Sequence, residues 1–546
     1  MTTPMKRERW GTRIGLVLAM AGNAVGLGNF LRFPRLAAEY GGGAFIIPYL
    51  VALVLLGIPL MWLEWAMGRY GGQFGHSTTP GMLQRMWRSP LAKYVGSLGI
   101  SLPLLFAVYY TYVESWTLAY ACFSVTGEFE AETAATSAAA GDVGVETAAL
   151  PGAASNQFLR DYQGITPPEE RRFFTTLVPA ISFWLIAVGL NCWIIARGIS
   201  GGIERLAKVA MPALFLFAIV LAVRVLTYGT PDPLHPERSV WVGLNYVWQP
   251  QLRALADFEV WLVAAGQIFF TLSIGTGTIQ CYASYLRRRD DCALTGLTTA
   301  ATNEFAEVVL GGTIAIPMAV ATFGLVATQT IAAQGSFNLG FVAMPVIFHQ
   351  MPAGQLFATL WFLLLFFAGI TSSVAMCQPL VAFLQDEFRL SRRVAAGVCC
   401  GAMLGLGLPI VLCFETGYMD QYDFWVGTFG LVICALAEVL IFGWAFGKRR
   451  MWAELRRGAE IRIPRLVVPV IRYVVPVYLS ILLAGWMMQE LGDAVLMKGV
   501  PPEHRPYLWL ARATMAGVIV GTVALVGIAW RRRANAAATS NEEAAR

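Results

Sequence analysis

Three stretches of this sequence place polar oxygen atoms inside otherwise apolar segments. Residues 22–34 read Gly-Asn-Ala-Val-Gly-Leu-Gly-Asn-Phe-Leu-Arg-Phe-Pro, residues 303–307 read Asn-Glu-Phe-Ala-Glu, and residues 368–373 read Ala-Gly-Ile-Thr-Ser-Ser. Oxygen ligands without thiolate or imidazole suit a hard cation, and carboxylates inside a membrane are functional candidates by default. For residues 371–373 the alternative is that the hydroxyls bond their own helix carbonyls. The residue types therefore favour a cation site.

Residues 22–34 also interrupt the first long apolar segment. Glycine costs about 1 kcal/mol relative to alanine inside a helix, and Gly22, Gly26 and Gly28 lie together here with Asn23 and Asn29. Free backbone groups inside a bilayer cost several kcal/mol unless something binds them. A break at this depth therefore needs an occupant. The alternative is a kinked helix whose small residues lie at a helix crossing.

A second apolar segment is interrupted in the same way. Residues 269–278 read Phe-Phe-Thr-Leu-Ser-Ile-Gly-Thr-Gly-Thr. Two interrupted helices at corresponding places of two oppositely oriented halves are typical of inverted-repeat secondary transporters. Half-helix N-termini suit an anionic group, and exposed carbonyls suit a cation. A zwitterion together with a monovalent cation would satisfy both.

The composition identifies the elements that must position these residues. Of 546 residues, 57% are hydrophobic and 14% are charged, whereas soluble domains carry about 25% charged residues. A membrane-crossing helix needs about 20 apolar residues. We therefore predict an all-α membrane protein with twelve transmembrane helices, at 13–37, 42–70, 89–125, 173–190, 197–227, 258–285, 293–325, 353–387, 392–411, 415–446, 466–489 and 507–530.

The predicted spans form one transporter domain over 1–533. Its inverted repeats cover about 13–227 and 258–446, five helices each, and two C-terminal helices follow. Most lysines and arginines fall in alternate connections, which predicts that both termini are cytoplasmic. Residues 127–160 are acidic and rich in alanine, and are predicted to form a flexible extracellular loop. Residues 534–546 are predicted to be a disordered cytoplasmic tail.

Other functional classes find little support in the sequence. The 9 cysteines and 4 histidines show no metal-ligand spacing, and no nucleophile–base or His-Glu-x-x-His pattern indicates an enzyme. The net charge of +6 does not indicate a nucleic-acid partner, because the basic residues lie at helix ends. A channel would need a continuous pore lined by rings of residues. Helices interrupted asymmetrically within a single chain argue against such a pore. A membrane sensor that binds an amino acid without net transport remains an alternative.

Taken together, the motifs resemble the neurotransmitter:sodium symporter family, and most closely its bacterial amino-acid branch with the leucine carriers. They are residues 22–34, Gly-Gln-Ile-Phe-Phe-Thr-Leu-Ser at 266–273 and Phe-Ala-Gly-Ile-Thr-Ser-Ser at 367–373. The resemblance runs from about Arg7 to Arg533. It implies a sodium-coupled, chloride-independent importer of a neutral, apolar or mildly polar L-amino acid. It further implies alternating access, the inner membrane of a prokaryote and, as an open possibility, a homodimer.

The resemblance implies two sodium sites. The first would use the substrate carboxylate together with Ala24, Asn29, Thr271 and Asn303. The second would use the carbonyls of Gly22, Val25 and Ala368 with the hydroxyls of Thr371 and Ser372. A ligand shared between ion and substrate couples their binding, because each then raises the affinity for the other by the same factor.

Three positions carry further implications. Glu307 stands where chloride-requiring members have serine, so its carboxylate can replace the anion. Protonation of Glu307 in the return step would make the transporter export a proton. Gly26 stands where amine carriers have aspartate, so the substrate must bring its own carboxylate. Glu64, inside the second span, is either a functional carboxylate or a cap for the amides of a broken helix.

The resemblance also implies the substrate pocket. Its walls would be Asn23, Ala24, Leu27, Gly28, Phe106, Tyr110, Phe270, Thr271, Ser273, Thr276, Ser372 and Met376. Phe106, Thr276 and Met376 replace the valine, phenylalanine and isoleucine of leucine-carrying members. The volume is thus redistributed, and one methylene is worth only about 1–3 kcal/mol in such a pocket. Leucine specificity therefore cannot be carried over.

Gates complete the implied machinery. On the outside, Arg32 would pair with Asp423, with Asp420 nearby and the rings of Tyr110 and Phe270 as a lid. On the inside, Arg7 would pair with Asp386 near Ser284 and Tyr285. Exposed ion pairs contribute only about 0–1 kcal/mol and can be incidental. Their positions on opposite sides of the breaks favour gating.

Overall fold

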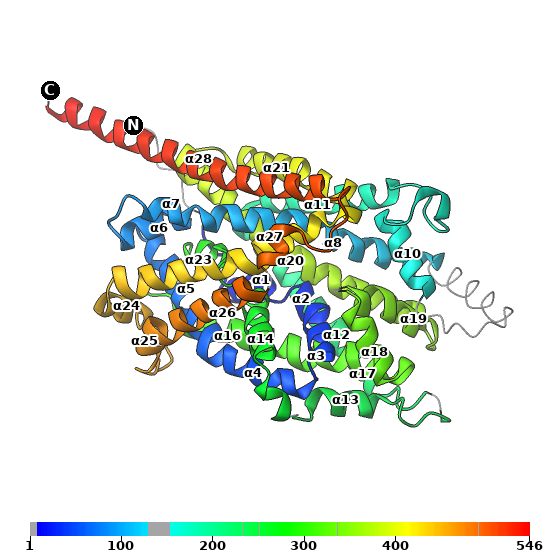
Figure 1. Ribbon diagram of the computed structural model, residues 1–546. Coiled ribbons are helices and arrows are strands. Elements are labelled where there is room, and N and C mark those ends of the chain that lie inside the picture. The colour runs from blue at the N-terminus through cyan, green and yellow to red at the C-terminus, as the bar shows by residue number, and fades with distance from the viewer. Residues whose placement is uncertain are drawn as a thin grey trace.

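In the computed structural model, the chain is a bundle of helices (Figure 1). The structure describes residues 8–128, 153–231, 233–250, 252–335, 337–489 and 491–545, and this part of the chain contains no β-strand. Arg7 lies outside it, as do residues 129–152 of the predicted loop. The predicted all-α class is confirmed.

Ten helices or continuous helical runs are long and apolar enough to cross a membrane among the described residues. They are α4–η1–α5 (Gly43–Gly72), α7–α8 (Ala92–Thr126), α11 (Val178–Ala196), η3–α12 (Ile199–Leu226), α16–η5–α17 (Ala293–Phe323), α20 (Gly354–Phe388), α21 (Arg392–Leu412), α22–η8–α23–η9 (Tyr418–Ala445), the part Val467–Met488 of α25–η10–α26 (Val467–Gln489) and the part Arg505–Asn535 of α28 (Arg505–Ala545).

The remaining two predicted spans are the interrupted ones. In the first, α1 (Arg13–Ala24) is followed by α2 (Leu27–Phe30) and α3 (Arg32–Glu39), and the halves are bent by 58°. In the sixth, α14 (Phe258–Thr271) and α15 (Thr278–Ala283) are separated by residues 272–277. Both breaks therefore fall where the glycine-rich motifs predicted them.

The break in the sixth span needs left-handed backbone. Ser273, Gly275 and Gly277 have φ angles of 54°, 77° and 84°, a region that only glycine enters without cost. Space also demands glycine at 275, because a Cβ there would lie 2.3 Å from the Leu431 carbonyl oxygen. The Gly275 amide donates to the Glu64 carboxylate at 2.7 Å. The contact made by Glu64 is the one expected of a cap for the broken helix.

Short helices lie at both ends of the bundle (Figure 1). At one end lie α6 (Thr79–Met86), α24 (Lys448–Leu455) and α25. At the other lie α10 (Ala153–Gln163) and α19 (Met344–His349). Further short helices are α13 (Val240–Trp248), α18 (Leu325–Ala333), η6 (Leu339–Ala343) and α27 (Leu491–Leu496), with one-turn segments η2 (Pro168–Glu170), η4 (Leu252–Ala256) and η7 (Phe414–Thr416).

Two peripheral predictions differ from the structure. Residues 153–160 of the predicted flexible loop belong instead to α10, where Phe158 and Leu159 are buried and Ser155 donates to the Phe341 carbonyl at 3.3 Å. From residue 534 the described chain continues helix α28 to Ala545. Both segments are rich in alanine. Their composition favoured a loop, but alanine has the highest helix propensity of all residues.

One buried cation fastens α24 to the second span. Arg69 is fully buried, and its guanidinium pairs with the Glu454 carboxylate at 3.1 Å. It also donates to the carbonyls of Asp290 at 2.7 Å and Arg457 at 2.5 Å, and to the Glu454 carbonyl. A buried charge with this many partners fixes the relative positions of three separate segments.

Replacing Arg69 by methionine is expected to destabilise the protein by about 1–3 kcal/mol, because buried acceptors on Glu454 and the Asp290 carbonyl lose their donor, while Arg457 still pairs with the Glu454 carboxylate at 3.3 Å. Thermal unfolding of the purified protein in detergent measures the effect as a lower Tm. Arg13→Ala is the matched control: it removes the Arg13–Glu460 pair, whose side chains are 60% and 57% exposed. Exposed pairs contribute about 0–1 kcal/mol, so an equal Tm loss in both variants would contradict this role of Arg69.

Candidate functional site

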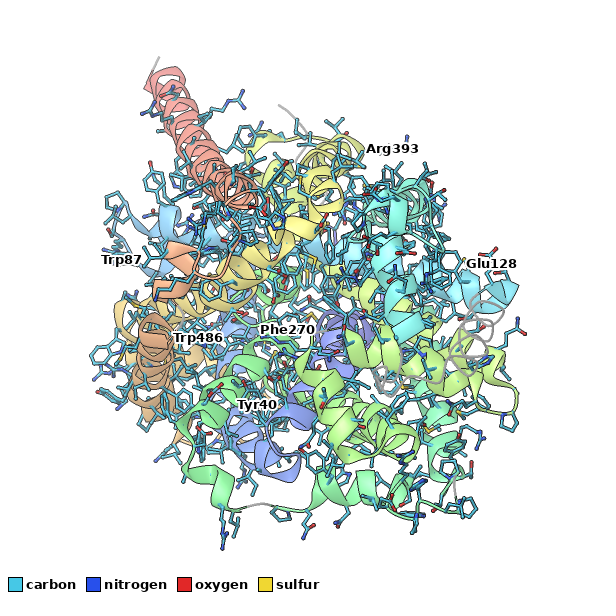
Figure 2. All side chains as sticks on the ribbon, turned by 45° about the vertical axis from the view of Figure 1, so that its right-hand side comes forward. Tyr40, Trp87, Glu128, Phe270, Arg393 and Trp486 are labelled. Carbon is cyan, nitrogen blue, oxygen red and sulfur yellow. The ribbon has the colours of Figure 1, made fainter. Side chains whose placement is uncertain are left out.

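The two breaks meet in the middle of the bundle, where Figure 2 places Phe270. The Ser273 hydroxyl donates to the Asn23 carbonyl at 2.9 Å and so joins one break to the other. A Cβ built on Gly28 would lie 2.7 Å from the Phe270 ring. Irregular backbone of both spans thus lies in one place, within contact distance of the side chains predicted to bind substrate.

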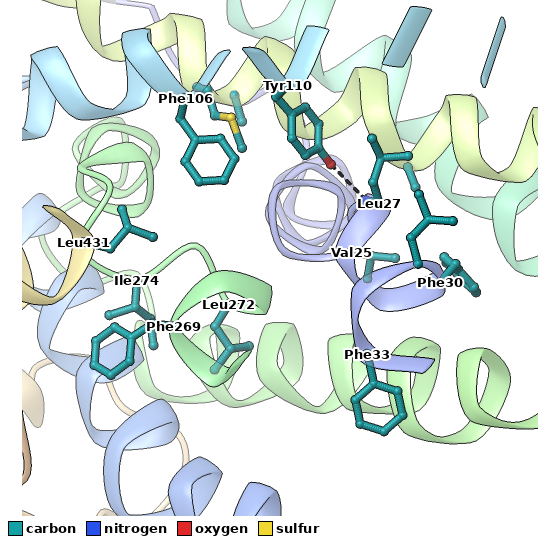
Figure 3. Packing of buried hydrophobic residues seen from close by; sticks show 14 of the residues in the cluster. Val25, Leu27, Phe30, Phe33, Phe106, Tyr110, Phe269, Leu272, Ile274 and Leu431 are labelled. Carbon is teal, nitrogen blue, oxygen red and sulfur yellow. Dashed lines mark hydrogen bonds between the residues drawn. The ribbon is translucent and has the colours of Figure 1, made fainter. Parts of the chain in front are cut away.

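Close approach of side chains explains glycine at position 26. The Tyr110 hydroxyl accepts from the Leu27 amide at 2.8 Å, as the dashed line in Figure 3 shows. A Cβ on Gly26 would lie 2.7 Å from that hydroxyl and 3.0 Å from the Ser372 hydroxyl. Gly26 itself has extended backbone, with φ −123°. Space, and not a left-handed conformation, therefore requires the glycine.

The residues predicted for the first sodium site form one buried hydrogen-bonded cluster. The Asn29 side-chain NH2 donates to the Asn303 amide oxygen at 2.8 Å and to the Glu307 carboxylate at 3.0 Å. The Asn29 oxygen accepts from the Gly26 amide at 2.8 Å. Thr271 donates to Glu307 and receives a hydrogen bond from Asn303 at 3.0 Å. The structure thus brings Asn29, Thr271 and Asn303 together around one carboxylate.

A further donor reaches Glu307 from the sixth span. The Gln267 side-chain NH2 donates to the second carboxylate oxygen at 2.7 Å, and both residues are fully buried. Gln267 lies four residues before Thr271, on the same face of α14. The sequence motif contained Gln267, and an amide inside an apolar helix could have been recognised as a candidate.

The residues predicted for the second sodium site lie where α1 contacts α20. The Ser372 hydroxyl donates to the Gly22 carbonyl at 3.1 Å, and a Cβ on Gly22 would lie 2.9 Å from the Thr371 Cβ. The Thr371 hydroxyl donates to the Phe367 carbonyl at 2.8 Å and to the Ala368 carbonyl at 3.2 Å. The carbonyl end of α1 therefore faces the hydroxyls of α20, an all-oxygen set that suits a hard cation.

Aromatic rings surround the predicted side-chain pocket. The Phe106 ring lies 5.5 Å from the Phe270 ring and 5.8 Å from the Tyr110 ring, and Met376 is buried. The Thr276 hydroxyl donates to the Ser273 carbonyl at 2.7 Å and lies 2.6 Å from the Thr278 hydroxyl. The Thr276 hydroxyl is therefore engaged within the break itself.

Four of the predicted outer gate residues line one pocket of about 90 Å³, with further residues from α8 and the α18–η6 connection: Arg32, Tyr110, Phe270 and Asp423, whereas Asp420 does not line it. The Arg32 guanidinium lies 4.3 Å from the Phe270 ring centre, a cation–π contact. Asp423 accepts instead from the Tyr109 hydroxyl at 3.0 Å. Among the described residues no ion pair joins Arg32 to Asp423. Sequence reasoning did not identify Tyr109.

At the inner end, the structure places two of the predicted gate residues. Asp386 accepts from the Ser77 amide at 2.8 Å, and the Tyr285 hydroxyl accepts from Gln378 at 2.9 Å. Arg7, the predicted partner of Asp386, lies outside the described residues. Trp10, three positions later, donates to the Tyr282 carbonyl at 3.2 Å. The segment before α1 thus packs against α15, next to the predicted gate.

Comparison with known proteins decides what this arrangement is. The family model described as "Sodium:neurotransmitter symporter family" matches residues 7–529, nearly the whole chain. The chain belongs to the sodium:neurotransmitter symporter family. An uncharacterized sodium-dependent transporter of Methanocaldococcus jannaschii is 30% identical over 84% of this chain and 86% of its own length. This family consists of secondary transporters, so the chain is a sodium-dependent membrane transporter and not an enzyme.

Two further similar proteins are associated with amino acids. The mouse "Sodium- and chloride-dependent neutral and basic amino acid transporter B(0+)" is 27% identical over 82% of this chain and 74% of its own length. The crystal structure of MhsT in complex with L-phenylalanine has a TM-score of 0.72 and 26% identity, covering 88% of this chain and 99% of that chain. The symporter fold with two interrupted helices is therefore the fold of this chain.

Proposed function

We propose that this symporter imports a neutral L-amino acid, apolar or mildly polar, together with two sodium ions and without chloride. Transport would proceed by alternating access around the two breaks. The proposal places the protein in the inner membrane of a prokaryote with both termini in the cytoplasm. A homodimer is compatible with it, and no partner beyond lipid, sodium and substrate is required.

The space around Gly26 is the main observation that favours an amino acid, and not an amine without a carboxylate, as the substrate. With only 2.7 Å between a Cβ at Gly26 and the Tyr110 hydroxyl, an aspartate side chain does not fit without displacing Tyr110. Position 26 itself therefore offers no carboxylate, and the nearby Glu307 carboxylate is already engaged by Asn29 and Thr271. A substrate that completes the first sodium site must carry one, as an amino acid does. The positive end of α2 and the Tyr110 hydroxyl are suited to receive it.

Each side of the substrate then has a role for residues of this chain. The ammonium group would meet the carbonyls of Ala24, Phe270 and Thr271 and the hydroxyl of Ser273. The side chain would enter the space among Phe106, Phe270 and Met376. Because the Thr276 hydroxyl is engaged with the Ser273 carbonyl, that wall offers mainly its methyl group. This favours apolar side chains, and the phenylalanine bound by MhsT is of this kind.

The second sodium ion is proposed at the contact of α1 with α20. The carbonyls of Gly22, Val25 and Ala368 and the hydroxyls of Thr371 and Ser372 would bind it as a transported ion. The ion at this site touches no substrate atom in the proposal, although its ligand Ser372 also lines the substrate pocket. This ion therefore acts by holding α1 against α20, whereas the first ion acts through the shared carboxylate.

Uptake into proteoliposomes tests the function. With a sodium gradient directed inward, at least one neutral L-amino acid from a panel of all twenty is expected to accumulate. Potassium in place of sodium is expected to abolish uptake, and replacing chloride by gluconate is expected to leave it unchanged. Binding without sodium-driven uptake would instead favour the sensor alternative. No uptake and no binding of any amino acid would contradict the proposed substrate class.

A further inference from the structure

The Asp423 carboxylate of the predicted outer gate is bound by a hydroxyl that does not belong to the Arg32–Asp423 pair. Tyr109 lies on α8, is 4% exposed, and donates to the Asp423 carboxylate at 3.0 Å. Its neighbour Tyr110 faces the substrate site through the Leu27 amide. Successive residues of one helix thus contact two different parts of the transport pathway.

The chain opposite Tyr109 is shaped to allow this hydrogen bond. Gly427 lies four residues after Asp423, one turn further along η8 (Asp423–Gly430). A Cβ on Gly427 would lie 2.7 Å from the Tyr109 hydroxyl and 3.0 Å from the Asp423 carboxylate oxygen. No real Cβ is accommodated at the shorter distance, so with any other residue at 427 the phenol or the carboxylate would have to shift.

Arg32, meanwhile, is held elsewhere. Its guanidinium lies 4.3 Å from the Phe270 ring centre, and its Nη1 atom is buried without a hydrogen-bond partner. The pocket of about 90 Å³ is lined by both Arg32 and Asp423. A guanidinium with a free donor and a carboxylate held by a phenol therefore face the same small cavity.

We propose that Tyr109 is a positioning residue of the outer gate, whose hydroxyl holds the Asp423 carboxylate away from Arg32. The inference rests on the proposed function, because a gate has meaning only in a transporter. Gly427 contributes by leaving room for the phenol. A hydrogen bond to a charged group is typically stronger than a partly exposed ion pair. The phenol can therefore hold the carboxylate against Arg32 until the pathway closes.

Hydrogen–deuterium exchange of the purified full-length protein in sodium, without any amino acid, tests this inference. In Tyr109→Phe the carboxylate is released to Arg32, and the outer pathway is expected to close more often. Peptides covering α3 and α18 should then exchange about three- to tenfold more slowly than in the wild type. A hydroxyl that merely stabilises the fold would give the opposite sign, since its loss speeds exchange. Unchanged or faster exchange would overturn the inference.

Further variants isolate the mechanism. Gly427→Ala separates the same two groups without altering the phenol and should also slow exchange. In an Arg32→Gln background, Tyr109→Phe should change nothing, because the competing cation is gone; slowing that persists there would refute the inference. Tyr112→Phe is the matched control, since Tyr112 lies on the same helix and packs edge-on against Trp116 and Phe414. The uptake panel is independent of these measurements, so either result can fail alone.

Discussion

Replacing Glu307 by serine is expected to make transport depend on chloride. The Glu307 carboxylate accepts hydrogen bonds from Gln267 at 2.7 Å, Asn29 at 3.0 Å and Asn303 at 3.3 Å, and from Thr271. Removing it leaves four buried donors converging on a space without an anion. A hydrogen bond to a charged group contributes about 1.5–3 kcal/mol, so chloride-free uptake should fall about tenfold or more. Chloride can occupy the vacated space and should restore most of the activity.

Uptake into proteoliposomes in chloride and in gluconate measures this effect. Glu304→Ser is the matched control, because it removes a carboxylate one turn earlier on the same helix. Glu304 receives a hydrogen bond from Asn303 at 3.4 Å but is not bonded to Asn29, Thr271 or Gln267. The control should therefore transport equally in both anions. Equal rates in chloride and gluconate for Glu307→Ser would show that the carboxylate does not substitute for an anion.

The positions of the breaks could be predicted from sequence because their cause is local. Glycine and asparagine inside an apolar run are unfavourable in a helix at that very place, whatever lies around them. The same reasoning identified Glu64, an isolated carboxylate in an apolar segment, as a possible cap. Which amide it accepts from, that of Gly275 at 2.7 Å, depends on the packing of the second span against the sixth. The spacing of residues in the sequence does not indicate that the second span packs against the sixth.

The direction of individual side chains was less predictable. Thr276 is three residues after Ser273 in a turn with left-handed residues, and this conformation directs its hydroxyl to the Ser273 carbonyl. Tyr109 and Asp423 are 314 residues apart, and nothing in either neighbourhood indicates their contact. A family motif can predict which residues belong to the site. The hydrogen bonds between them form only when helices distant in the sequence pack together.

Helix α10 illustrates a different limit. Its sequence is rich in small and polar residues and follows an acidic segment, so composition favoured a loop. Phe158 and Tyr162 nevertheless lie one turn apart, and both pack edge-on against Tyr120 of α8, with ring centres at 5.6 Å and 6.3 Å. A short apolar stripe of this kind is a weak signal alone and becomes stable only against its partner.

Asn29→Ala is expected to weaken sodium and substrate binding together. The Asn29 side chain joins the Gly26 amide of the first break to Asn303 and Glu307 of the seventh span. Its loss removes a proposed sodium ligand and loosens the backbone that would bind the carboxylate. Each affinity should fall about tenfold or more, because buried groups that lose a partner cost about 1–3 kcal/mol. Saturating sodium should not restore substrate affinity, since the Asn29 side chain also accepts from the Gly26 amide at 2.8 Å and so positions the backbone that would bind the carboxylate.

Thr371→Val provides the contrasting case. It removes a hydroxyl proposed to bind the second ion, which touches no substrate atom, while nearly preserving the shape of the side chain. Sodium affinity should fall, and saturating sodium should restore substrate affinity to near the wild-type value. Binding of labelled amino acid across a sodium titration distinguishes the two variants. If Asn29→Ala also regained normal substrate affinity at saturating sodium, its side chain would bind only the ion, and the proposed link from Asn29 to the carboxylate-binding backbone would be wrong.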